Sequence, residues 1–318
     1  MVFCSVVCRE AAREYHQYEC EMRLYELLPL EGKEMFGYFL ALRLITQRPL
    51  HYFLEHKPMF EAFFDLEEPL NIEHESIYKD EDYKNLMNLM THINDMPDSL
   101  TLKNSIISVF FLRFLQHGKY FQPLVPEKKE SDRSLHPAEE FILKLLHHLI
   151  AVQCFNSSQV TELAVVKAKY KWEVIGSSLH PSVALVNHSC DPNTFRFNMN
   201  QTCILIANRH ISPGEEITMS YSVDFKKVSL QEREFHLLKH YMFQCECPAC
   251  EGKWPEQENL EDELIRVPNF EQVGCSVVLL VSWLRARSKV TLSNMQERAY
   301  VVHHGDKGKI CDEINSAR

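Results

Sequence analysis

The sequence lacks any apolar stretch long enough to span a lipid bilayer, which takes about 20 residues as a helix. The apolar run at residues 275–281 is too short to cross and is typical of a buried helix or strand. The first ten residues also lack the basic lead and the long apolar stretch of a secretory signal peptide. These absences argue against a membrane association, and we expect the chain in the cytoplasm, the nucleus or both.

Positive charge is in short supply as well. The chain has 34 lysine and arginine residues against 44 aspartate and glutamate residues, for a formal net charge of −10. This balance argues against a nucleic-acid groove covering the whole surface, because phosphate contacts need basic side chains. It suits a basic peptide as substrate or partner. The 318 residues allow one large domain or two or three small ones.

Helical patterns fill the first half of the chain. Apolar residues recur at helical spacing over residues 36–48, and Pro49 predicts the end of that helix. Two further helical patterns occupy residues 83–116. The second is apolar nearly all round at residues 106–111, which predicts a fully buried helix. Pro137, followed by two glutamates, predicts the start of another helix.

Strand signals come later in the chain. Residues 195–199 alternate between apolar and polar side chains, with the two-residue period of a strand. Residues 202–207 can turn back against them, and residues 217–221 predict a third short strand. A helix is expected over residues 228–242, whereas residues 251–318 are weakly patterned. The order of elements predicts an α+β fold.

Cysteine is plentiful, with 11 residues. Without a secretion signal the surroundings are expected to be reducing, so metal ligation explains the cysteines better than disulfides. The strongest cluster is Cys-x-Cys-x-x-Cys at Cys245, Cys247 and Cys250. Three thiolates can share one metal, but structural zinc takes four ligands in a tetrahedron. Cys190, within Asn-His-Ser-Cys-Asp-Pro-Asn at residues 187–193, is the natural candidate for the fourth ligand.

A second group of metal-binding residue types lies near the N-terminus, at Cys4, Cys8, His16 and Cys20. A single zinc site is one interpretation, but the residues between Cys8 and Cys20 are rich in helix formers. At a rise of about 1.5 Å per residue, Cys8 and His16 would lie about 12 Å apart. Ligands that bind one zinc at about 2.0–2.3 Å cannot be so distant. We therefore expect Cys4 and Cys8 to serve one metal and His16 and Cys20 another. Each pair then lacks two ligands, which we expect in a segment ahead of this chain.

Other residues of the same types are expected to carry no metal. The remaining cysteines, among them Cys154, are isolated and are expected to be core or free cysteines. Histidines occur as adjacent pairs at residues 147–148 and 303–304. Adjacent side chains point apart on a helix, so these pairs are expected to be solvated or buried in the core rather than to bind a metal.

Together the motifs resemble a known family. Phe-Cys-Ser-x-x-Cys-x7-His-x-x-Glu-Cys at residues 3–20 is similar to the second half of a MYND zinc finger. Residues 187–193, Pro-Gly-Glu-Glu-Ile at 213–217 and Ser-Tyr at 220–221 are similar to the core of SET methyltransferases. The Cys-x-Cys-x-x-Cys at 245–250 resembles the post-SET zinc knot. In this order the motifs resemble the SET-and-MYND family of protein-lysine methyltransferases.

The resemblance covers about residues 1–256, and the segments at 155–163 and 250–255 are similar to the TPR-bearing, arthropod-rich branch of the family. It implies an α+β SET-domain fold of short β-sheets, with knot-like C-terminal threading around Tyr221, a helical insert, a partial MYND finger and a post-SET zinc site. The implied divisions are 1–20 for the second half of the MYND-type finger, 21–155 for a helical linker and SET insert, 156–225 for the core SET domain, 226–256 for the post-SET zinc segment, and 257–318 for an unassigned C-terminal extension.

The resemblance also implies a cofactor, a substrate and residue roles. S-Adenosylmethionine would donate a methyl group to a lysine of a histone or of another protein. The donor-binding residues implied are Asn156, Asn187, His188, Tyr221 and Phe243. Asn187 and His188 would hold the amino-acid and adenine ends of the donor, and Phe243 would pack on the adenine. Tyr221 would supply the catalytic hydroxyl, and Tyr241 would line the channel for the lysine. Zinc would be held by Cys190, Cys245, Cys247 and Cys250.

Glycine is the last scarcity, and it marks a departure from the family. Only nine residues are glycine, and no Gly-x-Gly occurs. SET domains begin with such a segment, whose backbone lets the donor approach closely, and in this family it precedes the MYND finger. We therefore expect it ahead of this chain. The alternative function is a truncated, catalytically weak fragment that acts as a zinc-dependent protein-interaction module. A proline-rich peptide is a further partner expected at the MYND-like end; direct nucleic-acid binding is not expected.

Overall fold

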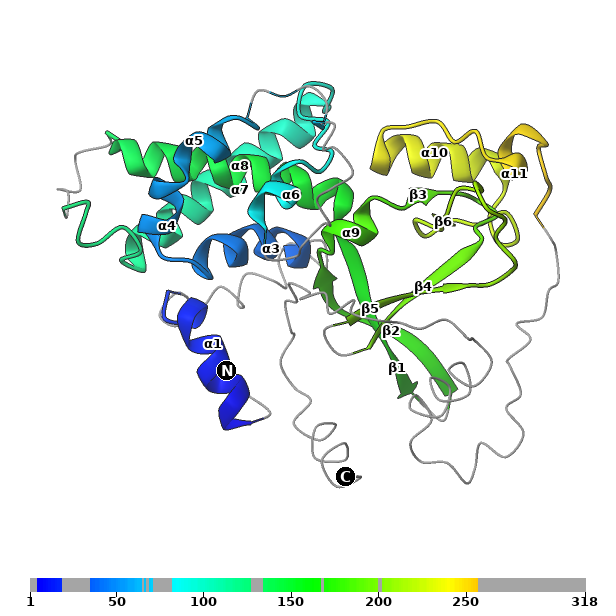
Figure 1. The fold of residues 1–318 in the computed structure, drawn as a ribbon, viewed down its shortest axis with the longest axis horizontal. Coiled ribbons are helices and arrows are strands. Elements are labelled where there is room, and N and C mark those ends of the chain that lie inside the picture. The colour runs from blue at the N-terminus through cyan, green and yellow to red at the C-terminus, as the bar shows by residue number, and fades with distance from the viewer. Residues whose placement is uncertain are drawn as a thin grey trace. The chain divides into compact units, whose positions relative to one another are not determined.

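The computed structural model describes residues 5–18, 35–64, 66, 69–70, 82–126, 134–166, 169–199 and 202–256. These residues divide into two compact units (Figure 1). Unit 1 holds the described residues up to 187 together with residues 196–206. Unit 2 holds residues 188–195 and 207–256.

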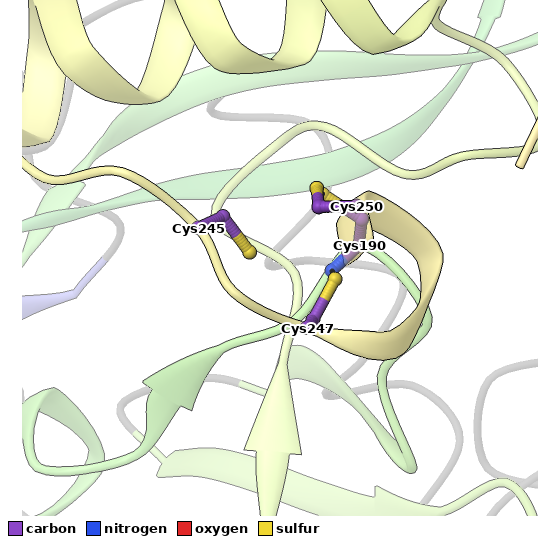
Figure 2. A group of neighbouring side chains, drawn as sticks. All are labelled: Cys190, Cys245, Cys247 and Cys250. Atoms are coloured by element: carbon purple, nitrogen blue, oxygen red, sulfur yellow. Dashed lines mark hydrogen bonds between the residues drawn. The ribbon is translucent and has the colours of Figure 1, made fainter. Parts of the chain in front are cut away.

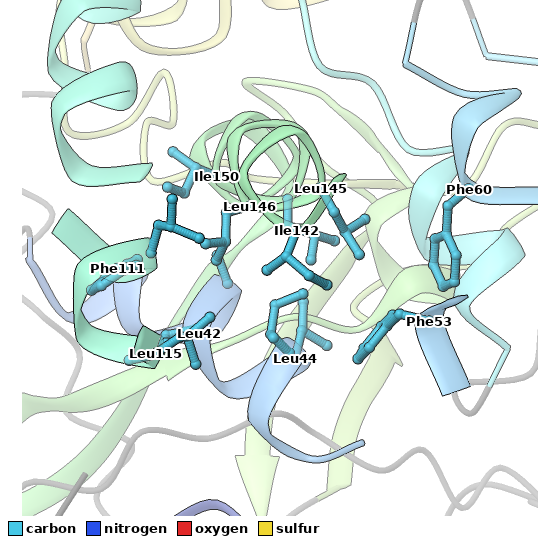
Figure 3. Packing of buried hydrophobic residues seen from close by; sticks show 14 of the residues in the cluster. Leu42, Leu44, Phe53, Phe60, Phe111, Leu115, Ile142, Leu145, Leu146 and Ile150 are labelled. Atoms are coloured by element: carbon cyan, nitrogen blue, oxygen red, sulfur yellow. The ribbon is translucent and has the colours of Figure 1, made fainter. Parts of the chain in front are cut away.

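The helices of unit 1 are α1 (Val6–His16), α3 (Met35–Thr46), α4 (Leu50–Glu55), α5 (Lys57–Glu61), α6 (Tyr83–Met87), α7 (Asp98–His117), α8 (Pro137–Asn156) and α9 (Pro181–Ala184). Helix α8 packs against α3 and α7 and lies at the centre of the core (Figure 3). The predicted helix at residues 36–48 is confirmed as α3, and Pro49 caps the start of α4.

The start of α8 follows from its sequence. The Ala138 N–H donates to His136 Nδ1 at 3.2 Å, and the Glu139 carboxylate accepts from the His136 N–H at 2.7 Å. Pro137 occupies the first helical position, where its missing N–H is not needed. The helix start predicted at Pro137 is therefore confirmed. Its buried apolar residues include Phe141, Ile142, Leu145, Leu146, Leu149, Ile150 and Val152.

Helix α7 differs from the prediction. Its sequence is apolar nearly all round, but only one side is buried, including Ile107 and Phe111. Ile106 is 60% exposed and Val109 is 46% exposed. The reason is the 3.6-residue period of the helix, which turns these residues away from the side that packs on the core. Apolar composition alone did not reveal that α7 lies at the edge of the core.

Two antiparallel hairpins supply most of the strands. Strand β1 (Ser158–Val166) pairs with β2 (Lys169–Ser178) in a register that sets Ser158 opposite Ser178, with an irregularity between Val160 and Thr161. This hairpin was not predicted from the sequence, although apolar and polar residues alternate in Tyr-Lys-Trp-Glu-Val at residues 170–174, as in a strand.

The second hairpin confirms a prediction. Strands β4 (Thr194–Met199) and β5 (Thr202–Ala207) match the strands expected at 195–199 and 202–207. The third strand, β6 (Thr218–Met219), is shorter than the predicted 217–221. Strand β6 pairs with β3 (Asn187–His188), which is also only two residues long.

Unit 2 carries two helices in the described residues, α10 (Leu230–Tyr241) and α11 (Pro248–Glu251). Ser229 caps α10: the Glu232 N–H donates to its Oγ at 3.4 Å, and the Glu232 carboxylate accepts from the Ser229 N–H at 3.3 Å. This reciprocal cap sets the first turn. The helix predicted at residues 228–242 is confirmed. None of the helices that the structure describes combines the length and the apolar character needed to cross a membrane.

The contrast between α7 and α8 can be tested with two leucine-to-alanine variants. Leu145 on α8 is fully buried, and Leu102 on α7 is 63% exposed. Leu145→Ala should lower the free energy of unfolding by about 2–5 kcal/mol, because it leaves a cavity in the core. Leu102→Ala should change it by about 0.5 kcal/mol or less. Urea denaturation of both variants measures the difference; equal losses would contradict the burial assigned to α8.

Candidate active site and metal centre

Four cysteine sulfurs converge in unit 2. The Sγ atoms of Cys190, Cys245, Cys247 and Cys250 all lie within 4.8 Å of one another (Figure 2). Cys190 Sγ and Cys250 Sγ are 3.5 Å apart. The structure therefore brings together the four residues that the sequence assigned to one metal.

Local hydrogen bonds bring the cysteines to this place. Cys247 caps the N-terminus of α11, with Pro248 at the first helical position, and the Cys250 N–H donates to the Cys247 carbonyl at 2.9 Å. This turn sets Cys247 and Cys250 side by side in residues 245–250, here called the cysteine loop. The Cys190 N–H donates to Cys247 Sγ at 3.4 Å, which ties the second segment to the loop.

The donor set fits zinc. Sulfurs about 2.3 Å from a tetrahedral zinc lie about 3.8 Å from one another, close to the spacing found here. Hydrogen bonding from Cys190 lowers the pKa of the Cys245 thiol. The same bond and burial raise the pKa of the Cys190 thiol. Four thiols this close, three of them buried, cannot all ionise without a cation among them, and a divalent metal would supply one.

His188 joins the cysteines to the backbone of Tyr221. Its ring is buried, with an exposed fraction of 8%. The Tyr221 N–H, which can only donate, lies 3.0 Å from His188 Nδ1, so Nδ1 accepts and carries no proton. In the neutral ring the proton is then on Nε2, which lies 3.3 Å from Cys190 Sγ and donates to it. Both ring nitrogens of His188 are thus engaged within the protein. A direct contact with a methyl donor would fall to its backbone or its ring carbons.

Aromatic rings surround Tyr221. Its ring centroid lies 4.9 Å from that of Tyr241, 5.3 Å from that of His188 and 6.4 Å from that of Phe243. The Tyr241 hydroxyl donates to the Tyr221 carbonyl at 3.1 Å. Tyr221, Tyr241, His188 and Phe243 are here called the aromatic cluster. The cluster brings the side chain predicted for the lysine channel next to side chains predicted for the donor site. Burial, followed by the neighbouring Tyr241 and Glu216, raises the pKa of Tyr221 to about 12. Its hydroxyl therefore keeps its proton at neutral pH.

The backbone turns sharply directly after Tyr221. Ser222 has a φ of 93°, a left-handed conformation that is strained in a residue with a side chain. Its Oγ lies 3.1 Å from His236 Nε2 on α10. This hydrogen bond links the turn to the helix. No sequence signal singled out Ser222 or His236.

Asn193 connects two of the sequence motifs. Its Nδ2 donates to the Glu215 carboxylate at 3.1 Å and to the Glu216 carbonyl at 2.7 Å, and its Oδ1 accepts from the Thr218 N–H at 2.8 Å. The side chain is almost fully buried, so these bonds are shielded from water. Hydrogen bonds from the Ser212 backbone first, then from Asn193 and Arg209, lower the pKa of Glu215 to about 2. Asn193 is the last residue of the motif at residues 187–193, and the sequence alone indicated no role for it.

The two asparagines predicted for the donor site belong to unit 1. Asn156 is the last residue of α8, and its Nδ2 donates to the carbonyls of Met90 and Val152, each at 2.7 Å. Both amide hydrogens are therefore used, and only Oδ1 remains available to a donor. Asn187 is exposed in β3. Their roles in donor binding stay predictions.

The N-terminal residue pairs are only partly described. Cys8 is exposed within α1, its N–H donating to Ser5 Oγ at 3.1 Å, and His16 is the last residue of the same helix. Eight residues of helix hold them about 12 Å apart, as expected from the sequence. Cys4 and Cys20 lie outside the described residues. A shared metal for either pair therefore stays a prediction.

Two of the residues expected to carry no metal lie in the core of unit 1. The Nε2 of His148 contacts the Met87 carbonyl at 3.0 Å, and burial lowers the pKa of its ring to about 4, so the ring is neutral. Cys154 packs against the core, and burial raises the pKa of its thiol to about 11. The core interpretation is confirmed for both. The pair at residues 303–304 lies outside the described residues.

Comparison with known proteins identifies the domain family of the chain. The family model of the SET domain matches residues 5–222, more than half of the chain. The chain belongs to the SET domain family. The predicted SET fold of helices and small sheets is therefore confirmed. The knot-like threading and the partial MYND finger stay predictions.

Several proteins similar to this chain are named as methyltransferases or as SET and MYND domain proteins. The chain is 28% identical to human protein-lysine N-methyltransferase SMYD4 over 113 residues, 34% of this chain and 14% of the relative. It is 33% identical to human histone-lysine N-methyltransferase SMYD1 over 140 residues, 40% of this chain and 26% of the relative. A SET and MYND domain-containing protein of Dictyostelium discoideum is 40% identical over 76 residues, 24% of this chain and 22% of the relative. The matches thus span about a quarter of these relatives or less, and they confirm the resemblance to SET-and-MYND proteins.

The link made by Asn193 in this SET domain can be tested by Asn193→Asp. The carboxylate loses both donors and places a negative charge against Glu215, so we expect a loss of about 2–4 kcal/mol in the free energy of unfolding. Asn208→Asp is the matched control, because Asn208 Nδ2 is exposed and donates only to the Pro192 carbonyl at 3.1 Å. It should lose about 1 kcal/mol or less. Urea denaturation at neutral pH gives both values, and a larger loss for the control would refute the role of Asn193.

Proposed function

We propose that this chain carries the catalytic core of an S-adenosylmethionine-dependent protein-lysine N-methyltransferase. The observation that carries the proposal is the aromatic cluster: a protonated Tyr221 hydroxyl is held among aromatic rings, and its backbone is fixed to the metal centre through His188. The SET family match and the names of the relatives support the same class of reaction.

The aromatic cluster fits the charges of such a reaction. S-Adenosylmethionine, when bound, supplies a methyl group on a positively charged sulfur. Aromatic faces attract cations, both a sulfonium and a methylated ammonium. Tyr241 and Phe243 offer aromatic rings next to Tyr221 within unit 2. Phe243 is proposed to pack on the adenine of the donor, and Tyr241 to line the lysine channel.

Tyr221 is the proposed catalytic residue. Its hydroxyl can accept a hydrogen bond from the neutral lysine amine and so aim the nitrogen lone pair. Because its pKa is raised to about 12, the hydroxyl does not take the lysine proton, which we propose leaves to water. Most of the rate enhancement then comes from alignment of the reacting atoms. Asn156, Asn187 and His188 are proposed to complete the donor site.

The proposed zinc is structural. Cys190, Cys245, Cys247 and Cys250 would fill all four positions of a tetrahedron and leave none for a substrate. Its proposed role is to hold the cysteine loop, and with it Phe243, against the segment that bears His188. The metal therefore supplies folding energy rather than chemistry.

The proposed substrate is a lysine within a basic protein segment, of a histone or of another protein. The net charge of −10 favours a basic partner. A proline-rich peptide is proposed as a partner of the N-terminal end only on the sequence resemblance there.

The metal content tests the zinc site. We expect one firmly bound zinc per chain and weak or no zinc at the N-terminus. Cys247→Ser should lose the zinc and lower the melting temperature, because metal binding is part of the folding energy. Cys203→Ser, at a cysteine of β5 outside the cluster, is the control and should keep the full zinc content. Elemental analysis together with thermal denaturation decides; three firmly bound zincs, or full zinc in Cys247→Ser, would contradict the assignment.

The role of Tyr221 is tested by Tyr221→Phe. In a form that carries the Gly-x-Gly segment, radiolabelled methyl transfer to histones or cell-extract proteins should fall about 100-fold, the loss typical for a hydrogen-bonding group that acts in the transition state. The present sequence, which lacks that segment, should bind the donor poorly and transfer slowly or not at all. The affinity for S-adenosylmethionine, measured by calorimetry, should change little because the ring is kept. Tyr52→Phe in α4 of unit 1 is the control and should transfer at the unmodified rate.

The same measurements separate the alternative function. A form that carries the Gly-x-Gly segment and holds one zinc but binds no S-adenosylmethionine would support the zinc-dependent interaction module and overturn the enzyme. Equal transfer rates in Tyr221→Phe and the unmodified chain would leave the enzyme standing and refute Tyr221 as its catalytic residue.

A further inference from the structure

Arg233 on α10 is a buried cation with no anionic partner among the described residues. Its exposed fraction is 0%. Its guanidinium donates to the Val228 carbonyl at 2.7 Å and to the Ala249 carbonyl at 3.4 Å, and its Nε has no partner in that part of the chain. Both acceptors are neutral carbonyls. Burying a charge without an opposite charge is strongly unfavourable, so the position needs an explanation.

The surroundings of Arg233 are the cysteines. Leu237, one helical turn further along α10 and on the same face, packs in the buried cluster that contains Cys190, Cys245 and Cys250. The Ala249 carbonyl that Arg233 binds belongs to the residue directly before Cys250. The guanidinium therefore lies against the cysteine loop, on the side of α10.

The negative charge of a zinc-loaded centre would explain why a cation is buried beside the cysteine loop. Four thiolates around one Zn²⁺ leave two net negative charges in a largely buried place. His188 Nε2 lies 3.3 Å from Cys190 Sγ and contributes a hydrogen bond to the site. Lys226, Lys227, Lys239 and Lys253, the described lysines of unit 2, are all exposed. Of the two described arginines of unit 2, Arg209 is exposed and Arg233 is buried.

We propose that Arg233 is a positioning residue of the metal centre, which balances part of the negative charge of the four-thiolate zinc site and clamps the cysteine loop through the Ala249 carbonyl. The inference rests on the proposed zinc site and assigns a role within it to a residue that touches neither donor nor substrate. Mutation of a residue that supports metal ligands without binding the metal commonly lowers metal affinity by about 10–100-fold.

Zinc affinity in three variants tests the proposal. Arg233→Met removes the charge and keeps the apolar stem, Arg233→Lys keeps the charge and loses the planar fork, and Lys239→Met removes an exposed charge on the same helix. Competition with a chromophoric chelator should show a loss of about 10-fold or more in Arg233→Met. The loss in Arg233→Lys should be clearly smaller, and Lys239→Met should match the unmodified chain.

Thermal denaturation with and without zinc distinguishes this role from a merely structural one. An arginine that only supports the fold would contribute equally to the melting temperature in both states. Arg233→Met should lower the melting temperature of the zinc-loaded chain. After chelation the same substitution should lower it much less or raise it, because the charge that Arg233 is proposed to balance belongs to the zinc-loaded site. Equal losses in both states would overturn the proposal.

The outcomes are distinguishable. Arg233→Lys binding zinc as poorly as Arg233→Met would overturn charge balancing, and unchanged affinity in Arg233→Met would overturn the inference as a whole while the zinc site stands. An unmodified chain without zinc would overturn both. Should Arg233→Met fail to fold, the zinc affinity of Arg233→Lys against Lys239→Met still decides: a match to the control overturns the clamp.

Discussion

The convergence of Cys190 on the cysteine loop is the constraint on which the described part of unit 2 depends. The two segments are distant in the sequence, and the Cys190 N–H bonded to Cys247 Sγ joins them. Once Cys190 is held, His188 two residues earlier can reach both Cys190 Sγ and the Tyr221 N–H. The metal-binding sulfurs and the proposed catalytic tyrosine are thus linked by one imidazole ring.

A second link runs through Asn193, on the other side of Cys190. The single buried amide group of Asn193 donates to two acceptors and accepts from the Thr218 N–H, and so connects the turn that follows Cys190 to residues 215–218. Together His188 and Asn193 tie both sides of Cys190 to the segment that leads to Tyr221. A short strand pair, β3 with β6, needs such support because its ladder is only two residues long.

Unit 1 is organised differently. Its stability rests on apolar burial around α8 rather than on polar links, and burial keeps His148 and Cys154 neutral. The same residue types therefore have opposite roles in the two units. In unit 1 burial keeps His148 and Cys154 uncharged, whereas in unit 2 the cysteines lie close enough to share a metal. Spacing along the chain distinguished the two cases, because Cys154 is isolated and the cysteine loop is not.

Local patterns in the sequence determined much of this protein. Pro137 with its glutamates set the start of α8, the alternation at residues 195–199 indicated β4, and the dense cysteine loop pointed to a metal with Cys190 as its fourth ligand. These features depend on neighbours in the chain, so a sequence can display them. Only the tertiary structure decided which side of α7 faces solvent, where the ring nitrogens of His188 go, and why Arg233 is buried. Each of these depends on groups that are distant in the sequence, and no local pattern records which distant atom will lie within hydrogen-bonding distance.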